Sequence, residues 1–263
     1  SIDAGAGDDR VVMDGYLNSS CTLEGGTGHD TLSVVHTLDM GADFLDHVTG
    51  FEVLRLSSGT GDTVHVITQD SLAYSAGDHV LHVDASGMQA LLWWDGANEV
   101  GGKFDVLGTS HDDSLVGGQT LNTLHGGDGN DSIIGNGTGD WLYGDAGDDA
   151  ISAGGASAHI SCGDGNDMVH MGGYLSSACT VLGGAGEDTL DYTFVSDQSA
   201  GHLDHVSGFE HLVIHYSQGG QGTPPVVTTS GSLVEAGHTL TVDATDLDGQ
   251  PLVFDGSLEY GSF

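Results

Sequence analysis

The sequence predicts an all-β fold of the parallel β-roll or β-solenoid type, in which short strands and turns coil around one axis. Three observations predict it: a nine-residue period, many glycines with few prolines, and the lack of any sustained helical period. The 263 residues include 45 glycines but 3 prolines, and 38% of them are hydrophobic. A disordered linker has fewer aliphatic residues, so the composition indicates glycine turns between buried strands.

The nine-residue period is clearest between residues 108 and 170, which divide into seven consecutive blocks, and the blocks 4–12, 25–33 and 183–191 follow the same pattern. The eighth position is aliphatic in all ten blocks, and the sixth is aspartate in eight of them, with Asn122 and Ala158 as the exceptions. A triplet centred on one buried aliphatic residue forms a minimal strand. The six residues before it form a turn in which glycine permits a positive φ.

The charge of the chain indicates that a cation takes part in folding. Asp and Glu number 39 against 3 Lys and Arg, which gives a formal net charge of -36. Two carboxylates about 5 Å apart repel by roughly 0.8 kcal/mol even in water, so a divalent metal is the natural counter-ion. The same charge disfavours nucleic acid and anionic membranes as partners. No apolar run is long enough for a membrane-spanning helix.

The repeated loops predict where such a metal binds. Two half-turns complete one coil, so every second loop stacks about 4.8 Å from its neighbour, and two loops together supply the six to eight oxygens that Ca²⁺ needs. The predicted ligands are Asp9, Asp30, Asp113, Asp131, Asp140, Asp149, Asp167 and Asp188, with Gly126, Asp128, Gly144, Gly163, Gly165 and Gly183. Because Asn122 and Ala158 replace the aspartate of their blocks, the pattern predicts a full row of calcium-binding loops on one side of the coil and a depleted row on the other. The alternative is that the aspartates only cap their own turns.

The pattern resembles the GGxGxDxUx nonapeptide of the RTX family, a calcium-binding β-helix repeat. The resemblance covers about 90 of the 263 residues. It implies several calcium ions between the loops ending at Asp113, Asp131, Asp149 and Asp167. It also implies type I secretion by a Gram-negative bacterium and an extracellular or cell-surface location.

A second, longer repeat is visible under a shift of 158 residues. Residues 5–33 then align with 163–191 without a gap and with 17 identities in 29 positions. The match continues from FLDHVTGFEVLRL at Phe44 to HLDHVSGFEHLVI at His202. We expect further repeats before residue 1. Such long-period repetition suits a protein that needs length more than a single active site.

These features divide the chain into five predicted segments. They are the end of an upstream repeat stack (1–33), a metal-poor solenoid spacer (34–107), an RTX β-roll (108–191), a second spacer with LDHVSGFE (192–222) and a final segment (223–263). The final segment begins with Pro224-Pro225 and is similar to the first strands of cadherin-like or immunoglobulin-like bacterial repeats. The other interpretation is a divergent copy of the solenoid turns around residues 63–104.

Several residue types invite further hypotheses. Cys162 and Cys179 are candidates for a disulfide, against the alternative of small buried thiols. Trp93-Trp94 is a candidate glycan platform, although alternation predicts one buried ring and one exposed ring. The 15 histidines lack the spacing of a transition-metal site, which favours surface polar roles.

The sequence therefore predicts a calcium-dependent structural or adhesive module of a secreted bacterial surface, S-layer or extracellular matrix protein. No catalytic motif is present, which favours a non-enzymatic chain. The alternative is an accessory RTX region of a secreted lipase, protease or polysaccharide-modifying enzyme. Self-association of solenoid ends into sheets or filaments, and binding of a glycan or cell-surface ligand, are further expectations.

Overall fold

The computed structural model describes residues 1–14, 20–35, 45, 47–58, 63–68, 79–173, 175–195, 203–217, 226–229, 233–234, 238–247 and 252–255. The described part of the chain consists of β-strands, turns and bends, as predicted. It holds no helix that is long and apolar enough to cross a membrane.

The strands are short, and most span two to six residues. In the N-terminal part they are β1 (Ile2–Asp3), β2 (Arg10–Asp14), β3 (Leu23–Glu24), β4 (Thr31–Val35), β5 (Val48–Thr49), β6 (Val53–Ser57), β7 (Val64–Ile67), β8 (Val80–Asp84), β9 (Leu92–Asp95) and β10 (Lys103–Leu107). In the middle they are β11 (Ser114–Val116), β12 (Thr123–Asp128), β13 (Ser132–Ile134), β14 (Trp141–Ala146), β15 (Ala150–Ser152), β16 (His159–Asp164), β17 (Met168–Gly172), β18 (Thr180–Ala185) and β19 (Thr189–Val195). The last are β20 (Val206–Ser207), β21 (His211–Ser217), β22 (Val226–Thr228), β23 (Thr241–Asp246) and β24 (Val253–Asp255).

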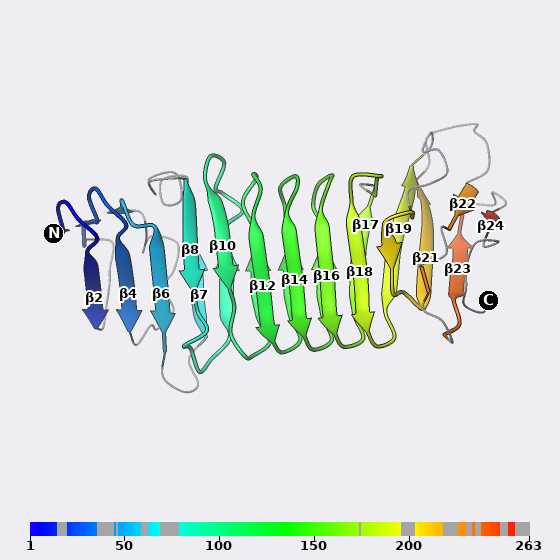
Figure 1. Cartoon of the computed structure of the whole chain (residues 1–263), viewed down its shortest axis with the longest axis horizontal. Coiled ribbons are helices and arrows are strands. Elements are labelled where there is room, and N and C mark those ends of the chain that lie inside the picture. Colours follow the sequence, from blue (N-terminus) through cyan, green and yellow to red (C-terminus); the bar gives the residue numbers. More distant parts are fainter. Residues whose placement is uncertain are drawn as a thin grey trace.

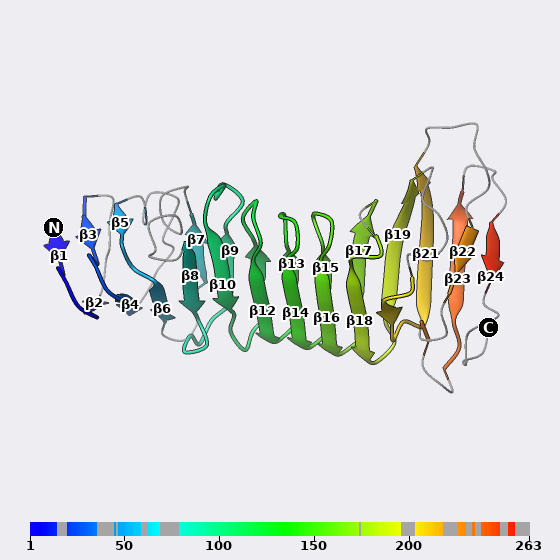
Figure 2. The same cartoon turned by 45° about the horizontal axis from the view of Figure 1, so that its top comes forward.

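The strands form a parallel β-solenoid with two long sheets. The ten-stranded sheet runs in the order β2-β4-β6-β8-β10-β12-β14-β16-β18-β20, and the nine-stranded sheet in the order β23-β21-β19-β17-β15-β13-β11-β9-β7. Two smaller parallel sheets, β1-β3-β5 and β22-β24, complete the set. From β6 to β21 successive strands alternate between the two long sheets, and Figures 1 and 2 show the strands side by side along the long axis from the N-terminus to the C-terminus.

Stacked aliphatic residues fill the space between the sheets. In the nonapeptide stack the register joins residues 18 positions apart, so that Leu124 pairs with Leu142 and Leu142 with Ile160. These side chains are at most 2% exposed, as is Ile133 on the facing sheet. The eighth block position is therefore the core position, because its side chain points inward from the centre of each short strand.

The solenoid continues through the described residues of the spacer, with longer turns. β8 pairs with β6 and with β10 in the ten-stranded sheet, while β9 joins β7 to β11 in the nine-stranded sheet. Val53 pairs with His82, 29 positions later, instead of with a residue 18 positions later.

The described residues of the final segment pair in the solenoid manner. β23 pairs in parallel with β21, and β22 pairs in parallel with β24. Immunoglobulin-like sandwiches are built from antiparallel sheets, so these parallel pairs support the divergent solenoid interpretation. Pro224-Pro225 lies outside the described residues.

The two copies of the 158-residue repeat lie on opposite sheets. The block at 25–33 leads into β4, which belongs to the ten-stranded sheet, whereas the equivalent block at 183–191 leads into β19 of the nine-stranded sheet. The repeat length therefore corresponds to an odd number of half-turns, and equivalent loops emerge on opposite sides of the solenoid.

Replacing Ile133 with alanine is expected to destabilise the calcium-saturated protein by about 2–5 kcal/mol, because the side chain is fully buried and its removal leaves a cavity. Its neighbour Ile134 is 38% exposed, so Ile134→Ala is the matched control with an expected change within about 0.5 kcal/mol. Chemical denaturation followed by circular dichroism measures both. Equal effects of the two variants would contradict the inward orientation of Ile133.

Candidate metal centre

A row of buried carboxylates runs along one side of the solenoid. The loops that precede β11, β13, β15, β17 and β19 each end in an aspartate, and these five residues are called the aspartate row: Asp113, Asp131, Asp149, Asp167 and Asp188. Each is at most 3% exposed. The parallel register, 18 residues from Asp113 to Asp167 and 21 residues from Asp167 to Asp188, places one above the next, which is unfavourable for like charges unless something compensates.

One oxygen of each carboxylate is held by a backbone amide of the preceding loop. Asp113 N donates to Asp131 Oδ1 at 2.7 Å, Asp131 N to Asp149 Oδ1 at 2.7 Å, Asp149 N to Asp167 Oδ1 at 2.8 Å, and Asp167 N to Asp188 Oδ1 at 2.8 Å. These bonds add to the backbone hydrogen bonds between successive loops, such as Ala150 N to Asp131 O at 2.8 Å, and they fix the side-chain orientation.

The other oxygen has no hydrogen-bond partner. Oδ2 of Asp131, Asp149, Asp167 and Asp188 is buried and unbonded. A buried carboxylate oxygen without a donor is costly, and native structures avoid it unless an ion or water completes the site. The donor set suits calcium, because hard cations prefer carboxylate and carbonyl oxygens. Across the described ranges, no three His, Cys, Asp or Glu side chains form a ready metal-binding group, so carbonyl oxygens would complete the shell.

Glycine at the first loop position makes room for this oxygen. A Cβ on Gly126 would collide with Asp131 Oδ2 and would lie 2.8 Å from the carbonyl oxygen of Gly144 in the next loop. A Cβ on Gly144 would likewise collide with Asp149 Oδ2. The carboxylate of one loop and a carbonyl of the next loop thus approach the same point.

A second ladder of polar side chains runs beside the aspartate row, on the exposed side. At the fifth loop position Asn130 N donates to Asp112 Oδ1 at 2.8 Å, Asp148 N to Asn130 Oδ1 at 2.9 Å, and Asn166 N to Asp148 Oδ1 at 2.7 Å. Here the side chain points toward the following loop, whereas in the aspartate row it points toward the preceding one. Alternation of Asp and Asn also lowers the charge density of this outer ladder.

The opposite side of the stack carries the depleted row that the sequence predicts. The loops before β12, β14 and β16 end in Asn122, Asp140 and Ala158, which are called the mixed row. Both oxygens of Asp140 are bonded: Oδ1 accepts from Asn122 N and Nδ2, and Oδ2 accepts from Gly137 N at 3.1 Å. Asp140 therefore lacks the free oxygen that marks the aspartate row.

Asp113, at the start of the aspartate row, also differs from the others. Its Oδ1 accepts from Leu92 N at 2.7 Å and from Thr109 Oγ1, and its Oδ2 accepts from Thr109 N at 2.6 Å. Of the predicted ligands in this row, the structure thus distinguishes the saturated Asp113 from the four aspartates with an unbonded oxygen.

The same arrangement recurs in the first repeat copy. Asp9 N donates to Asp30 Oδ1 at 2.8 Å, and Oδ2 of both residues is buried without a hydrogen-bond partner. Asp9 and Asp30 precede β2 and β4 of the ten-stranded sheet, so this short row lies on the side of the mixed row. Loop aspartates with unbonded oxygens therefore occupy opposite sides in the two copies.

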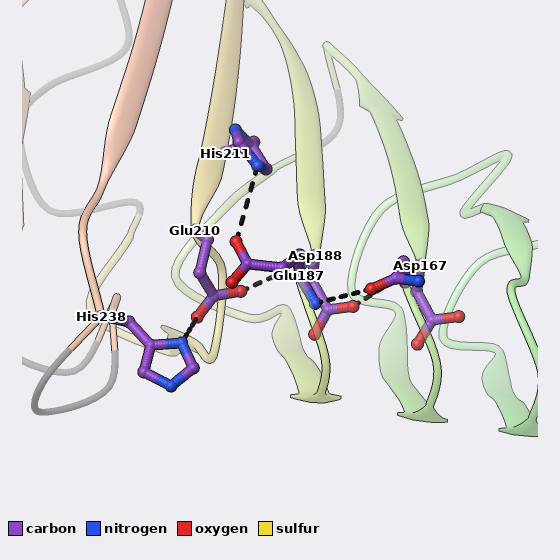
Figure 3. Close-up of polar contacts among 7 residues, drawn as sticks. Asp167, Glu187, Asp188, Glu210, His211 and His238 are labelled. Atoms are coloured by element: carbon purple, nitrogen blue, oxygen red, sulfur yellow. Dashed lines mark hydrogen bonds and ion pairs between the residues drawn. The ribbon is translucent and has the colours of Figure 1, made fainter.

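The aspartate row and the short row of Asp9 and Asp30 each end in a glutamate that the ligand prediction omits. Glu210 Oε2 accepts from Asp188 N at 2.9 Å, and Glu52 Oε2 accepts from Asp30 N at 2.7 Å. Figure 3 shows that the other oxygen of Glu210 contacts His238 Nδ1, at 3.2 Å. The sequence signal is the GFE of the LDHVxGFE phrase, whose glutamate directly precedes a strand as the block aspartates do.

Among the other predicted ligands, Gly163 and Gly165 have φ values of +115° and +147°, which favour glycine. Gly183 resembles Gly126, since a Cβ there would collide with the carbonyl oxygen of Gly208 and lie 2.6 Å from Asp188 Oδ2. The side chain of Asp128 lies on the exposed surface, apart from the buried row.

Cys162 and Cys179 are not joined to each other by a disulfide in the structure. Ser161 pairs with Leu182, so Cys162 lies beside Gly183, whereas Thr180 pairs with His159 and places Cys179 beside Ala158. Four positions along the strands then separate the two thiols, which is too far for a disulfide.

The tryptophan pair alternates as the strand pattern predicts. Trp94 is fully buried, and Trp93 is 47% exposed with its ring stacked on His65 at 4.5 Å.

Several histidines contact carboxylates of neighbouring turns. The pairs are His82–Asp105, His125–Asp145, His170–Asp191, His215–Asp191, His211–Glu187 and His238–Glu210. Glu187 belongs to the loop that ends in Asp188, and Glu210 lies at the end of the aspartate row.

Burial of the row changes its acidity. Burial, together with the charges of Asp113 and Asp149, raises the pKa of Asp131 to about 8 against the lowering effect of the Asp113 N–H bond. Burial likewise raises the pKa of Asp149 to about 7 and that of Asp188 to about 6. Without a cation the folded row therefore favours protonated carboxyls.

This shift predicts that the metal-free fold weakens as the pH rises. Because the folded-state pKa values exceed the ordinary value of 3.8, the folded chain binds more protons than the unfolded chain between about pH 4 and pH 8. Stability is thus greatest below this window and is lost as the pH rises through it. In EDTA, the β-sheet circular dichroism signal is expected to be larger at pH 5 than at pH 8. A signal that grows with pH would contradict protonation of the row.

Replacing Gly126 with alanine is expected to impair the site, since the added methyl would collide with Asp131 Oδ2. Gly87→Ala is the control, because a Cβ there would meet only Leu56 O, at 3.8 Å. The calcium concentration at half-maximal folding is expected to rise for Gly126→Ala and to stay constant for Gly87→Ala. Equal midpoints for both variants would show that the space above Gly126 is not needed.

The family comparison agrees with this geometry. A model described as RTX calcium-binding nonapeptide repeat (4 copies) matches residues 107–140, 125–160 and 134–169. Neither the curated proteins nor the solved structures gave a significant match. The matched ranges cover the loops of Asp113, Asp131, Asp149 and Asp167, and the ladder extends beyond them to Asp188. The chain thus carries RTX calcium-binding nonapeptide repeats over residues 107–169, folded as part of a parallel β-solenoid.

Proposed function

We propose that this chain is a calcium-dependent structural module of a secreted bacterial surface or matrix protein, with no catalytic role of its own. The observation that carries the proposal is the stack of buried carboxylates in which Asp131, Asp149, Asp167 and Asp188 each keep one unbonded oxygen. Such a stack is unfavourable alone and favourable around divalent cations, so metal binding and folding are coupled.

Calcium would be held between successive loops of the aspartate row. The ligands would be the unbonded Oδ2 atoms of Asp131, Asp149, Asp167 and Asp188, together with loop carbonyl oxygens. Asp9 and Asp30 would serve in the first copy, on the other side of the solenoid. When bound, calcium supplies the positive charge that these residues lack, and the residues position it through the amide ladder.

Under this mechanism, whether the chain folds would depend on the calcium concentration inside and outside the cell. At low calcium the chain, with a net charge of -36, would stay unfolded and suited to export. Millimolar external calcium would neutralise the loops and shift the equilibrium to the solenoid.

The 158-residue duplication favours a structural role over the support of an attached enzyme. Repetition lengthens a solenoid, but it adds nothing to a single active site. An adhesive or S-layer role would follow from such a solenoid at the cell surface.

Titration from EDTA into millimolar calcium, with magnesium as control, is expected to convert a coil spectrum into a β-sheet spectrum only with calcium. Asp149→Asn should lower the number of calcium ions bound per chain and raise the calcium midpoint, because an unbonded oxygen is lost. The control is Asp148→Asn, which removes the same charge from the exposed neighbour and keeps an acceptor for Asn166 N. A complete β-sheet spectrum in EDTA, unchanged by calcium, would contradict the proposal.

A further inference from the structure

Asn122 holds the sixth position of its block, where eight of the ten blocks have aspartate. Its side-chain Nδ2 faces a set of oxygens: Gly118 O at 2.9 Å, Asp140 Oδ1 at 3.0 Å, Gly135 O at 3.5 Å, and Thr120 O. Its Oδ1 accepts from Phe104 N and from Gly118 N, both at 3.3 Å. Carbonyl oxygens only accept and backbone amides only donate, so the partners determine this orientation of the amide.

The Asn122 nitrogen lies where an aspartate oxygen lies on the other side of the stack. A Cβ on Gly117 would lie 2.9 Å from Asn122 Nδ2 and would collide with Gly135 O. A Cβ on Gly126, the equivalent glycine of the aspartate row, would collide with Asp131 Oδ2 and lie 2.8 Å from Gly144 O. Asn122 Nδ2 thus replaces the unbonded oxygen of Asp131.

A nitrogen in place of an oxygen at this point removes the need for a cation. An NH₂ group surrounded by carbonyl and carboxylate oxygens forms hydrogen bonds and needs no ion. With an oxygen in the same place, the site contains only hydrogen-bond acceptors. A cation must then bind among these oxygens to offset their repulsion. In this loop pair Asn122 N and Nδ2 both bond Asp140 Oδ1, and Gly137 N bonds Asp140 Oδ2, whereas Oδ2 of Asp131 has no hydrogen-bond partner.

We propose that the side-chain amide of Asn122 substitutes for a calcium ion between the loops 117–122 and 135–140, and that this loop pair closes without metal. The inference rests on the proposed function, because it assumes that the aspartate row binds calcium. It assigns Asp140 to the metal-free pair and removes it from the calcium ligands that the repeat pattern predicts.

The pair gives the stack a metal-independent seam. β12 and β14, which follow these two loops, join in parallel in the ten-stranded sheet, and Leu124 and Leu142 stack beneath them fully buried. On the side of the mixed row, hydrogen bonds alone link these turns. On the side of the aspartate row, the turns need calcium to be linked in the same way.

Reciprocal substitutions test the proposal. Asn122→Asp creates an all-oxygen cluster with Asp140, so the folded chain is expected to bind about one more calcium ion than the wild type. Asp131→Asn places an amide nitrogen in the aspartate row, so the folded chain is expected to bind at least one ion fewer. Native mass spectrometry at saturating calcium counts the ions, and circular dichroism verifies that each variant is folded.

Asp140→Asn provides the control. In the wild-type background it should leave the calcium count unchanged, and in the Asn122→Asp background it should abolish the added ion. Unchanged counts in Asn122→Asp and Asp131→Asn would overturn the proposal. Should Asn122→Asp fail to fold, a loss of calcium on Asp140→Asn in the wild-type background would overturn it, and an unchanged count together with the loss in Asp131→Asn would support it.

A wild-type chain that binds no calcium would overturn the proposed function and this inference together. A wild type that binds calcium, with an Asn122→Asp variant that binds no more, would overturn this inference alone.

Discussion

The central constraint on this molecule is the stacking of parallel turns, 18 residues apart from Asp113 to Asp167 and 21 from Asp167 to Asp188, which places each loop carboxylate next to an identical one. The backbone amides of the preceding loop hold one oxygen of each carboxylate, with distances of 2.7–2.8 Å from Asp113 to Asp188. This leaves the second oxygen of Asp131, Asp149, Asp167 and Asp188 buried and without a hydrogen-bond donor. The parallel pairing of strands and the coupling of folding to a divalent cation both follow from the same register.

The outer ladder shows how the fold limits the cost of this stacking. Its Asp112, Asn130, Asp148 and Asn166 alternate charge with neutral amide, and each side chain bonds toward the following loop. In the aspartate row the bonds point toward the preceding loop. Every loop is therefore tied to both neighbours, and a loop that slipped along its neighbour would lose bonds in both directions.

The nine-residue period was sufficient to predict the parallel solenoid and the inward-facing residues of the repeat blocks, because each depends only on position within the block. The division into a full and a depleted calcium row stays a prediction. The glutamates Glu52 and Glu210 were not predicted, since Glu210 ends a three-residue connection from β20 to β21, Gly208 to Glu210, that is outside the nonapeptide pattern. The role of Asn122 was also missed: a sequence gives the residue type but not which atoms surround its amide. The spacer has no period, so the number of half-turns between Asp30 and Asp113 was unknown, and with it the side on which each row lies.

The placement of the two rows on opposite sides affects how the solenoid resists bending. Asp9 and Asp30 lie on the side of the ten-stranded sheet, whereas the aspartate row lies on the side of the nine-stranded sheet. Cross-links that lie along one side alone resist bending away from that side. They do not resist bending in the opposite direction. With ions bound in both rows, neighbouring stretches of the solenoid would be braced on opposite flanks. Each stretch would then resist bending away from its own braced flank, so the two stretches would resist bending in opposite directions.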